Sequence, residues 1–223
     1  MKPATNPRVK ICCIATVEEA WMAIDFGASA VGLVSAMPSG PGVISEELIE
    51  EIAATIPPGV SSFLLTCHQN VADIVEQQTR LRVNAIQLCD VLDEGDHREL
   101  RNSLPGISIV QVIHVNGTES VEEALSAAPF VDALLLDSGS KTSAIKELGG
   151  TGRVHDWSLS KLIRQEVKIP VWLAGGLNSS NVSEAIEQVK PFGVDVCTGV
   201  RTDGQLDKNK LADFFRGVRT ART

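Results

Sequence analysis

The chain has 223 residues, of which 43% are hydrophobic, and a formal net charge of −8 at pH 7. The acidic balance argues against a general nucleic-acid binder, and neither a membrane-spanning run nor a signal-peptide core is found in the sequence. Five cysteines, an odd number, fit a reducing compartment better than a disulfide framework, so we expect a cytoplasmic globular protein.

Short apolar runs rich in β-branched residues alternate along the chain with amphipathic stretches. The runs predict strands, in chain order, at Val9–Cys12, Ala30–Val34, Val60–Leu65, Ala85–Leu88, Ile107–Ile113, Ala133–Asp137, Val171–Ala174 and Gly193–Val196. A capping box at Thr16 and Glu19, with a stop at Gly27, predicts the first helix, and Ser45 opens the second. Further helices are predicted at Val71–Leu81, His97–Leu104, Ser120–Ala128, Ser158–Gln165, Asn181–Val189 and Lys208–Val218.

Eight strand–helix units in a chain of this length predict an α/β fold, a single (β/α)8 TIM barrel spanning residues 1–223. A doubly wound open sheet shows the same alternation, but usually has fewer strands and a glycine-rich turn after the first one. Here the first strand ends in Cys12 and Cys13, and the glycine-rich turns come late in the chain. The barrel is therefore the better interpretation.

Barrel enzymes place their active sites at the carboxyl ends of the strands, where this chain has polar and thiol side chains. These residues are Cys12, Cys13, Cys67, His68, Cys89, Asp90, His114, Asp137, Ser138, Cys197 and Thr198. Adjacent cysteines such as the first two rarely form a disulfide, which leaves a reactive, a metal-ligating or a buried thiol as alternatives. We expect an active site at this end of the barrel.

Lys10 is an unusual residue in an apolar strand. The period-two alternation of a strand puts it on the same face as Cys12, and puts Asp195 on the same face as Cys197. Barrel closure makes the first and last strands neighbours. Because a lone inward lysine is costly to bury, we predict a buried Lys10–Asp195 ion pair that biases Cys12 toward the thiolate.

Glycine-rich turns occur near three successive strand ends late in the chain. They read ELGGTGRVHDW (147–157), LAGGLNSSN (173–181) and CTGVR (197–201). Glycines let backbone N–H groups converge on an anion, and barrels commonly bind phosphate after their seventh and eighth strands. The turns predict a phosphate site, although tight strand–helix turns alone would read in the same way.

These motifs, together with KIC on the first strand, DALLLDS on the sixth and PFGVDV on the eighth, resemble the phosphoribosylanthranilate isomerase family along nearly the whole chain. The resemblance implies an Amadori rearrangement of N-(5-phosphoribosyl)anthranilate in tryptophan biosynthesis, without a cofactor or metal. It implies Cys12 as the general base and Asp137 as the general acid. It places phosphate binding at Gly150, Thr151, Gly152, Gly175, Gly176, Thr198 and Gly199.

The sequence departs from the family near the mouth of the barrel. The second strand–helix loop, SAMPSGPGVIS, has Gly42 where the family has the arginine that holds the anthranilate carboxylate. The other departures are KICC for KICG, QLCD for QLHG and CTGVR for SSGVE. Arg201 could replace the lost arginine if its side chain reaches inward. We expect substrate contacts at Lys10, Gln87, Cys89 and Arg201.

Several alternatives remain at this point. A paralogous barrel could act on, or merely bind, a different phosphorylated sugar-type ligand. Cys12 could be an inert buried thiol, and Asp137 could cap the following loop. Scattered cysteines and histidines could hold a soft metal, but no CxxC pair anchors them. Beyond a small phosphorylated substrate, the expected partner is at most a second copy of the chain in a homodimer.

Overall fold

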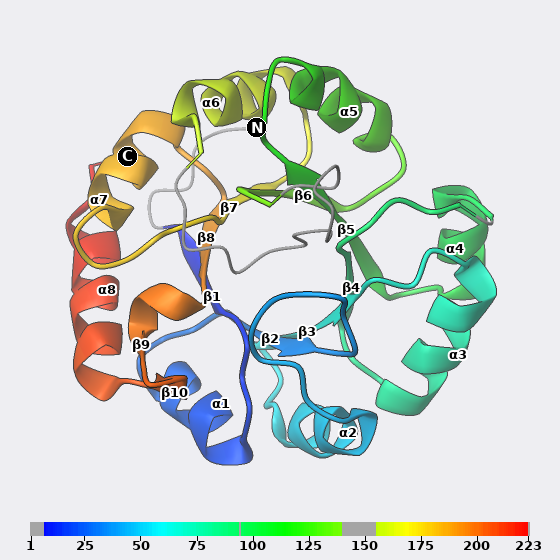
Figure 1. Ribbon diagram of the computed structural model, residues 1–223, viewed down its shortest axis with the longest axis horizontal. Helices are drawn as coiled ribbons and strands as arrows, with labels where there is room; N and C mark the ends of the chain where they lie inside the picture. Colours follow the sequence, from blue (N-terminus) through cyan, green and yellow to red (C-terminus); the bar gives the residue numbers. More distant parts are fainter. Residues whose placement is uncertain (1–6, 94, 140–154, 223) are drawn as a thin grey trace.

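The computed structural model describes residues 7–93, 95–139 and 155–222. Eight parallel strands close into a barrel in the order β1 to β8, with the helices packed around the outside (Figure 1). The predicted (β/α)8 barrel is confirmed.

The strands of the barrel lie within one residue of their predicted ends. They are β1 (Arg8–Ile11), β2 (Ala30–Val34), β3 (Ser61–Thr66), β4 (Ala85–Leu88), β5 (Ser108–His114), β6 (Ala133–Asp137), β7 (Val171–Leu173) and β8 (Gly193–Val196). Cys12 thus follows β1 directly instead of ending it. β1 pairs in parallel with β8, and Lys10 lies opposite Asp195 in that register, which closes the barrel.

The helices also follow the predicted pattern. They are α1 (Val17–Asp25), α2 (Glu46–Thr55), α3 (Val71–Leu81), α4 (His97–Ser103), α5 (Glu119–Ala127), α6 (Trp157–Glu166), α7 (Val182–Val189) and α8 (Lys208–Thr220). The Thr16 hydroxyl oxygen accepts a hydrogen bond from the Glu19 N–H at 3.1 Å, as a capping residue should. Gly27, with a φ of +105°, ends the first strand–helix unit as expected.

A small element between β8 and α8 is absent from the prediction. A 3-10 turn, η1 (Thr198–Val200), leads into an antiparallel pair, β9 (Arg201–Thr202) and β10 (Gln205–Leu206). Strands of two residues carry no readable periodicity, so the pattern of the sequence could not indicate them.

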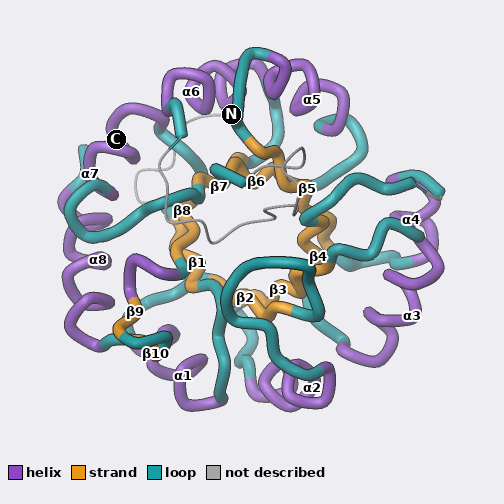
Figure 2. The backbone as a smooth tube through the Cα atoms, in the orientation of Figure 1, coloured by secondary structure: helices purple, strands orange, loops and turns teal. Residues whose placement is uncertain are grey.

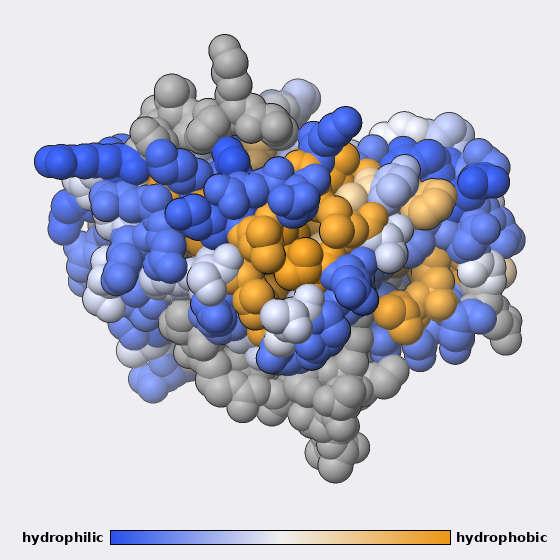
Figure 3. All heavy atoms as spheres, turned by 90° about the horizontal axis from the view of Figure 1, so that it is seen from above, coloured by the Kyte–Doolittle hydropathy of each residue, from blue (hydrophilic) through white to orange (hydrophobic). Residues whose placement is uncertain are grey.

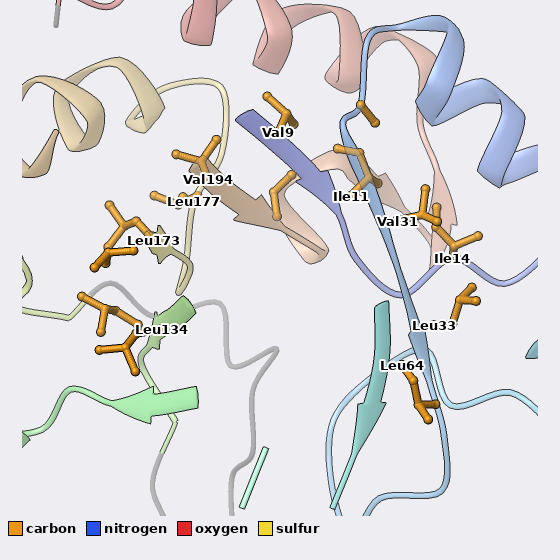
Figure 4. Packing of buried hydrophobic residues seen from close by; sticks show 14 of the residues in the cluster. Val9, Ile11, Ile14, Val31, Leu33, Leu64, Leu134, Leu173, Leu177 and Val194 are labelled. Atoms are coloured by element: carbon orange, nitrogen blue, oxygen red, sulfur yellow. The ribbon is translucent and has the colours of Figure 1, made fainter. Parts of the chain in front are cut away.

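The buried side chains form two layers. The larger cluster fills the space between the strands and the surrounding helices; part of it, including Ile11, Val31 and Leu64, is drawn in Figure 4. The smaller cluster fills the barrel itself, where the rings of Phe63 and Trp172 meet edge to face at 6.0 Å between centroids. The interior of the barrel is therefore largely filled by side chains.

Three further observations concern the surface of the molecule. The loop between β2 and α2 lies over the barrel opening in the view of Figure 2, where it can form part of a site. One face of the molecule, seen in Figure 3, is mostly hydrophilic, with apolar side chains gathered between the polar ones. Within the described residues, every helix is too short or too polar to cross a bilayer.

Candidate active site

One cavity opens at the carboxyl ends of the strands, where the sequence predicts the site. Its walls come from the segments that follow β1, β2, β7 and β8 and from the ends of β3, β4 and β6. The lining residues are Cys12, Cys13, Val34, Met37, Ser39, Gly40, Pro41, Leu65, Gln87, Asp137, residues 174–177 and residues 195–198. The structure thus brings Cys12 and Asp137, which are 125 positions apart, into one cavity.

Cys12 is a buried thiol held in place by backbone hydrogen bonds. Its N–H donates to the Val196 carbonyl at 2.9 Å, and the Arg201 guanidinium donates to its carbonyl at 3.2 Å. A hydrogen bond with Cys13 and the positive charge of Lys10 lower the pKa of the Cys12 thiol, against the effect of burial, which raises it. This environment favours a thiolate at the wall of the cavity.

The predicted ion pair of Lys10 is confirmed. Lys10 Nζ lies 2.9 Å from Asp195 Oδ2, the lysine is completely buried, and its ammonium sits 5.4 Å from the centroid of the Phe63 ring. Burial acts to lower the pKa of Lys10, but the negative charges of Asp195 and Cys12 hold it above its ordinary value. Lys10 is therefore a charged residue beneath the site, and it is not among the residues that line the cavity.

Asp137 ends β6 and lines the same cavity. Its Oδ1 accepts hydrogen bonds from the Ser138 N–H at 2.7 Å and from the Ser138 hydroxyl at 3.4 Å. The carboxylate therefore caps the start of the next loop, as the alternative interpretation expects. Since Asp137 also lines the cavity, the capping bonds can orient a group that acts on a ligand.

The glycine turns after β7 and β8 form another wall. Gly175 and Gly176 have φ values of +82° and +64° and line the cavity together with Thr198. A Cβ at Gly199 would overlap the carbonyl oxygen of Leu177, so the two turns pack too closely for a side chain there. The expected phosphate residues Gly150, Thr151 and Gly152 lie outside the described residues.

Of the two substrate residues expected at β4, Gln87 lines the cavity and Cys89 does not. Gln87 lines the cavity, and its Oε1 is buried without a hydrogen-bond partner among the described residues. Cys89 is fully buried and does not line the cavity, and burial raises the pKa of its thiol. Its Sγ makes long contacts with Gln87, at 3.8 Å to Nε2 and 3.7 Å to the carbonyl oxygen. Gln87 is thus available to a ligand, whereas the geometry does not support a direct contact for Cys89.

Arg201 does not reach inward as a replacement for an arginine of the β2–α2 loop. Its guanidinium contacts Glu19 at 2.9 and 3.1 Å and donates to the carbonyl oxygens of Cys12 and Cys13. These partners lie on α1 and on the segment after β1, and Arg201 is not among the lining residues. Its geometry indicates that it holds the Cys12 segment in place, in contrast to the expected substrate contact.

His155 is a residue that sequence reasoning passed over, although it stands in the motif GRVHDW. Its Nε2 lies 2.6 Å from the Ser160 hydroxyl, and its buried Nδ1 has no hydrogen-bond partner among the described residues. Burial lowers the pKa of His155, against the opposing effect of the Asp137 charge. An imidazole close to the Gly175 turn is a feature that only the folded chain shows.

The cysteines of the strand ends do not assemble into a metal centre. Cys12, Cys13 and Cys197 line the cavity, while Cys67 and Cys89 do not. Within residues 7–93, 95–139 and 155–222, no group of three or more histidine, cysteine, aspartate or glutamate side chains is arranged to hold a metal ion.

Comparison with known proteins identifies the family to which the chain belongs. The family model described as N-(5'phosphoribosyl)anthranilate (PRA) isomerase matches residues 9–217. The N-(5'-phosphoribosyl)anthranilate isomerase of Methanocella arvoryzae is 32% identical to this chain, over 96% of this chain and 99% of that protein. N-(5'-phosphoribosyl)anthranilate isomerase 2 of Methanosarcina mazei is 36% identical, over 93% of this chain and 92% of that protein.

Solved structures show the same likeness. The phosphoribosyl anthranilate isomerase of Thermotoga maritima has a TM-score of 0.78 and 32% identity, over 96% of this chain and 98% of that chain. A phosphoribosyl anthranilate isomerase in complex with reduced 1-(o-carboxyphenylamino)-1-deoxyribulose 5-phosphate has a TM-score of 0.76 and 30% identity, with the same coverage. The chain therefore belongs to the N-(5'-phosphoribosyl)anthranilate isomerase family, a family of isomerase enzymes.

Proposed function

We propose that this chain catalyses the Amadori rearrangement of N-(5-phosphoribosyl)anthranilate to 1-(2-carboxyphenylamino)-1-deoxyribulose 5-phosphate. The observation that carries the proposal is the cavity shared by Cys12 and Asp137, because it pairs a thiol of lowered pKa with a carboxyl group. Family membership supplies the reaction, and the two side chains supply a base and an acid for it.

The reaction needs two proton transfers. The Asp137 carboxyl donates a proton to the furanose ring oxygen, the bond from C1′ to that oxygen breaks, and the nitrogen lone pair forms an iminium. The Cys12 thiolate then removes the proton from C2′, which the iminium has made acidic. The electrons of that C–H bond form the enolamine, which tautomerises to the ketone product.

The surroundings of Cys12 support its role as the base. The ammonium of Lys10, paired with Asp195 at 2.9 Å, places a positive charge beneath the thiol. A fixed cation close to a thiolate stabilises it more strongly in a buried site than it would in water. We assign Lys10 to this indirect role, in place of the substrate contact expected from the sequence.

The phosphate group would bind at the turns after β7 and β8. Gly175, Gly176 and Thr198 line the cavity, and the positive φ values of the glycines turn the backbone sharply beside it. α7 begins at Val182, just beyond the first of these turns, and its dipole adds a favourable field for an anion.

The test is the loss of anthranilate-type fluorescence after the substrate is generated in situ. We expect fast decay with the wild type and a rate lower by about 10²–10⁴-fold for Cys12→Ser and for Asp137→Asn. Cys67→Ser and Asp93→Asn are matched controls at residues that do not line the cavity, and they should keep the wild-type rate. Wild-type activity in Cys12→Ser or Asp137→Asn would contradict the assigned roles.

A second candidate function comes from a specific observation. The described residues that line the cavity include neither lysine nor arginine, and Arg201 is bound to Glu19. A related barrel that binds or converts another phosphorylated sugar would need no partner for an aromatic carboxylate. No decay above the uncatalysed rate, together with binding of ribulose 5-phosphate-type esters, would favour this alternative.

A homodimer remains a prediction for this chain. One similar structure, with a TM-score of 0.76, is of monomers generated from the dimeric phosphoribosylanthranilate isomerase of Thermotoga maritima. Sedimentation equilibrium at several concentrations would measure the mass of the particle, and a monomer mass throughout would contradict the prediction.

A further inference from the structure

Two residues with left-handed backbone conformations meet at the edge of the cavity. Cys13 has a φ of 61° and Gly42 a φ of +80°. A Cβ added at Gly42 would overlap the Cys13 Cβ and would lie 2.9 Å from its Cα and 3.0 Å from its Sγ. The Cys13 side chain therefore occupies the space into which a side chain at position 42 would have to grow.

Hydrogen bonds anchor the chain on both sides of this contact. The loop that carries Gly42 returns to the barrel through a bridge between Val34 and Val43, and the Ile44 N–H donates to the Val34 carbonyl at 3.0 Å. On the other side, the Arg201 guanidinium donates to the carbonyl oxygen of Cys13. Cys13 itself is buried, so a larger group at position 13 has no solvent to escape into.

Cys13 has a different role from its neighbour Cys12. Hydrogen bonds with Cys12 and Cys197, together with burial, raise the pKa of the Cys13 thiol well above its ordinary value. Cys13 is therefore a neutral thiol that donates to the thiolate and fills space. It acts as a positioning residue, and Cys12 alone of the two has the environment of a base.

The contact shapes the part of the cavity next to the β2–α2 loop. Val34, Met37, Pro41 and Leu65 make this wall apolar, and it carries no cationic side chain among the described residues that line the cavity. Gly42 is the loop position whose side chain would point at Cys13, and the thiol excludes one there.

We propose that Cys13 and Gly42 form a coupled pair that determines specificity, in which only one of the two positions can carry a side chain. With the side chain at position 13, the loop closes on the barrel and the aryl group of an N-aryl ribosylamine phosphate meets an apolar wall. The ring carboxylate then contributes little to recognition. This inference rests on the proposed isomerase function for its substrate, but the coupling itself does not.

A stability cycle tests the coupling without any assay of activity. Gly42→Ala should lower the Tm by about 4 °C more than Gly204→Ala, because the overlap with Cys13 adds to the backbone strain. Gly204 is a matched control, since its φ is also +80° and no atom lies within 4 Å of the position that a Cβ would take there. In a Cys13→Gly background the excess loss should shrink, because the overlaps with the Cys13 Cβ and Sγ are gone and only the 2.9 Å approach to the Cα of residue 13 is left. Equal losses for the two alanine variants, or an unchanged excess in that background, would overturn the proposal.

An activity cycle tests the consequence for recognition. We expect Gly42→Arg to lower kcat/KM at least about tenfold, and Cys13→Gly/Gly42→Arg to recover it. In the double variant the KM for the anthranilate substrate should fall about tenfold relative to Cys13→Gly, while the KM for the N-phosphoribosyl aniline analogue stays constant. Additive effects on kcat/KM would overturn the specificity role. If the wild type shows no turnover, the proposed function fails, and the stability cycle still decides the coupling.

Discussion

Two ion pairs support Cys12, and they differ in the number of partners that each cation has. Lys10 and Asp195 pair inside the barrel through one contact of 2.9 Å, and Asp195 Oδ1 has no hydrogen-bond partner among the described residues. Arg201 makes two hydrogen bonds to the Glu19 carboxylate and further ones to the carbonyls of Cys12, Cys13 and Gly204. The first pair places a positive charge near the Cys12 thiol, whereas the second pair holds the backbone of the segment after β1 in place.

The difference has a physical cause. A guanidinium has five N–H donors in a fixed fork and can join several oxygens at once, whereas an ammonium is a compact point charge. The barrel interior holds few backbone acceptors, because its strands pair with one another, so a lysine there acts mainly through its field. The inner cation therefore tunes the site, and the outer cation holds the framework around it.

The largest effect is expected from breaking the inner pair. Lys10→Met leaves the Asp195 carboxylate buried and unpaired, which should cost about 3–5 kcal/mol of the free energy of unfolding. Denaturant unfolding measures this loss. Lys10→Met/Asp195→Asn should regain most of the stability but little of the activity, because the Lys10 charge lowers the pKa of Cys12 by more than the Asp195 charge raises it. The acid limb of the kcat/KM profile of this double variant should move to higher pH. An acid limb at the wild-type pH would show that Lys10 does not lower the pKa of the Cys12 thiol.

A smaller effect is expected from breaking the outer pair. Arg201→Gln removes the hydrogen bonds to the Cys12 segment and leaves the Glu19 carboxylate, whose side chain is 13% exposed, without its cation. We expect a loss of about 2–3 kcal/mol in the free energy of unfolding. The change in activity should appear in kcat more than in KM, since Arg201 lies outside the cavity lining.

The matched control for that variant is another arginine with an ion pair. Arg216 contacts Asp213 at 2.7 Å, but its side chain is 68% exposed. Arg216→Gln should change the free energy of unfolding by less than about 1 kcal/mol, because water screens an exposed pair. An equal loss for both variants would show that the contacts of Arg201 with the backbone carbonyls contribute little.

The smallest effects are expected from pH, and Glu19 of the outer pair and Lys10 of the inner pair should respond at opposite ends of the scale. Burial raises the pKa of Glu19, but hydrogen bonds from Arg201 and from backbone N–H groups bring it below its ordinary 4.5. Its contribution to stability is present above pH 4.5 and is lost as the pH falls through the folded-state value. The pKa of Lys10 lies above its ordinary 10.5, so its contribution is present below pH 10.5 and is lost as the pH rises through the folded-state value.

Thermal melts in acidic and alkaline buffers check both directions. Arg201→Gln should flatten the acid side of the stability profile, and Lys10→Met/Asp195→Asn should flatten the alkaline side. An unchanged acid side in Arg201→Gln, or an unchanged alkaline side in Lys10→Met/Asp195→Asn, would mean that the wrong pair has been assigned to that side of the profile.

Much of the fold could be predicted because its signals are local and periodic. The strands fall within one residue of their predicted ends, since each apolar run is bounded by cap or turn residues. The Lys10–Asp195 pair could be predicted as well, because alternation along a strand and closure of the barrel fix both partners. Cys12, Asp137 and the turns after β7 and β8 lie at one cavity, as expected, because parallel strands end at the same side of a barrel.

The contacts between loops could not be predicted in this way. The sequence suggests that Arg201 faces the substrate, but a two-residue strand without a readable period turns it toward Glu19, 182 positions away. Gly42 stands out in the sequence only as the place of a missing arginine, and nothing there indicates that it packs on Cys13. His155 belongs to a motif that predicts only a glycine-rich turn. The motif does not indicate that the His155 Nδ1 is buried close to Gly175.

The sequence by itself determined the barrel, the pairing of β1 with β8 that closes it, and the residues that end each strand. These features follow from hydrophobic period and capping, which are properties of short segments. Only the tertiary structure decided which strand-end side chains enter the cavity and which are held by a neighbour. That choice depends on how loops distant in sequence pack against one another once the barrel closes, and no repeating pattern in the chain encodes it.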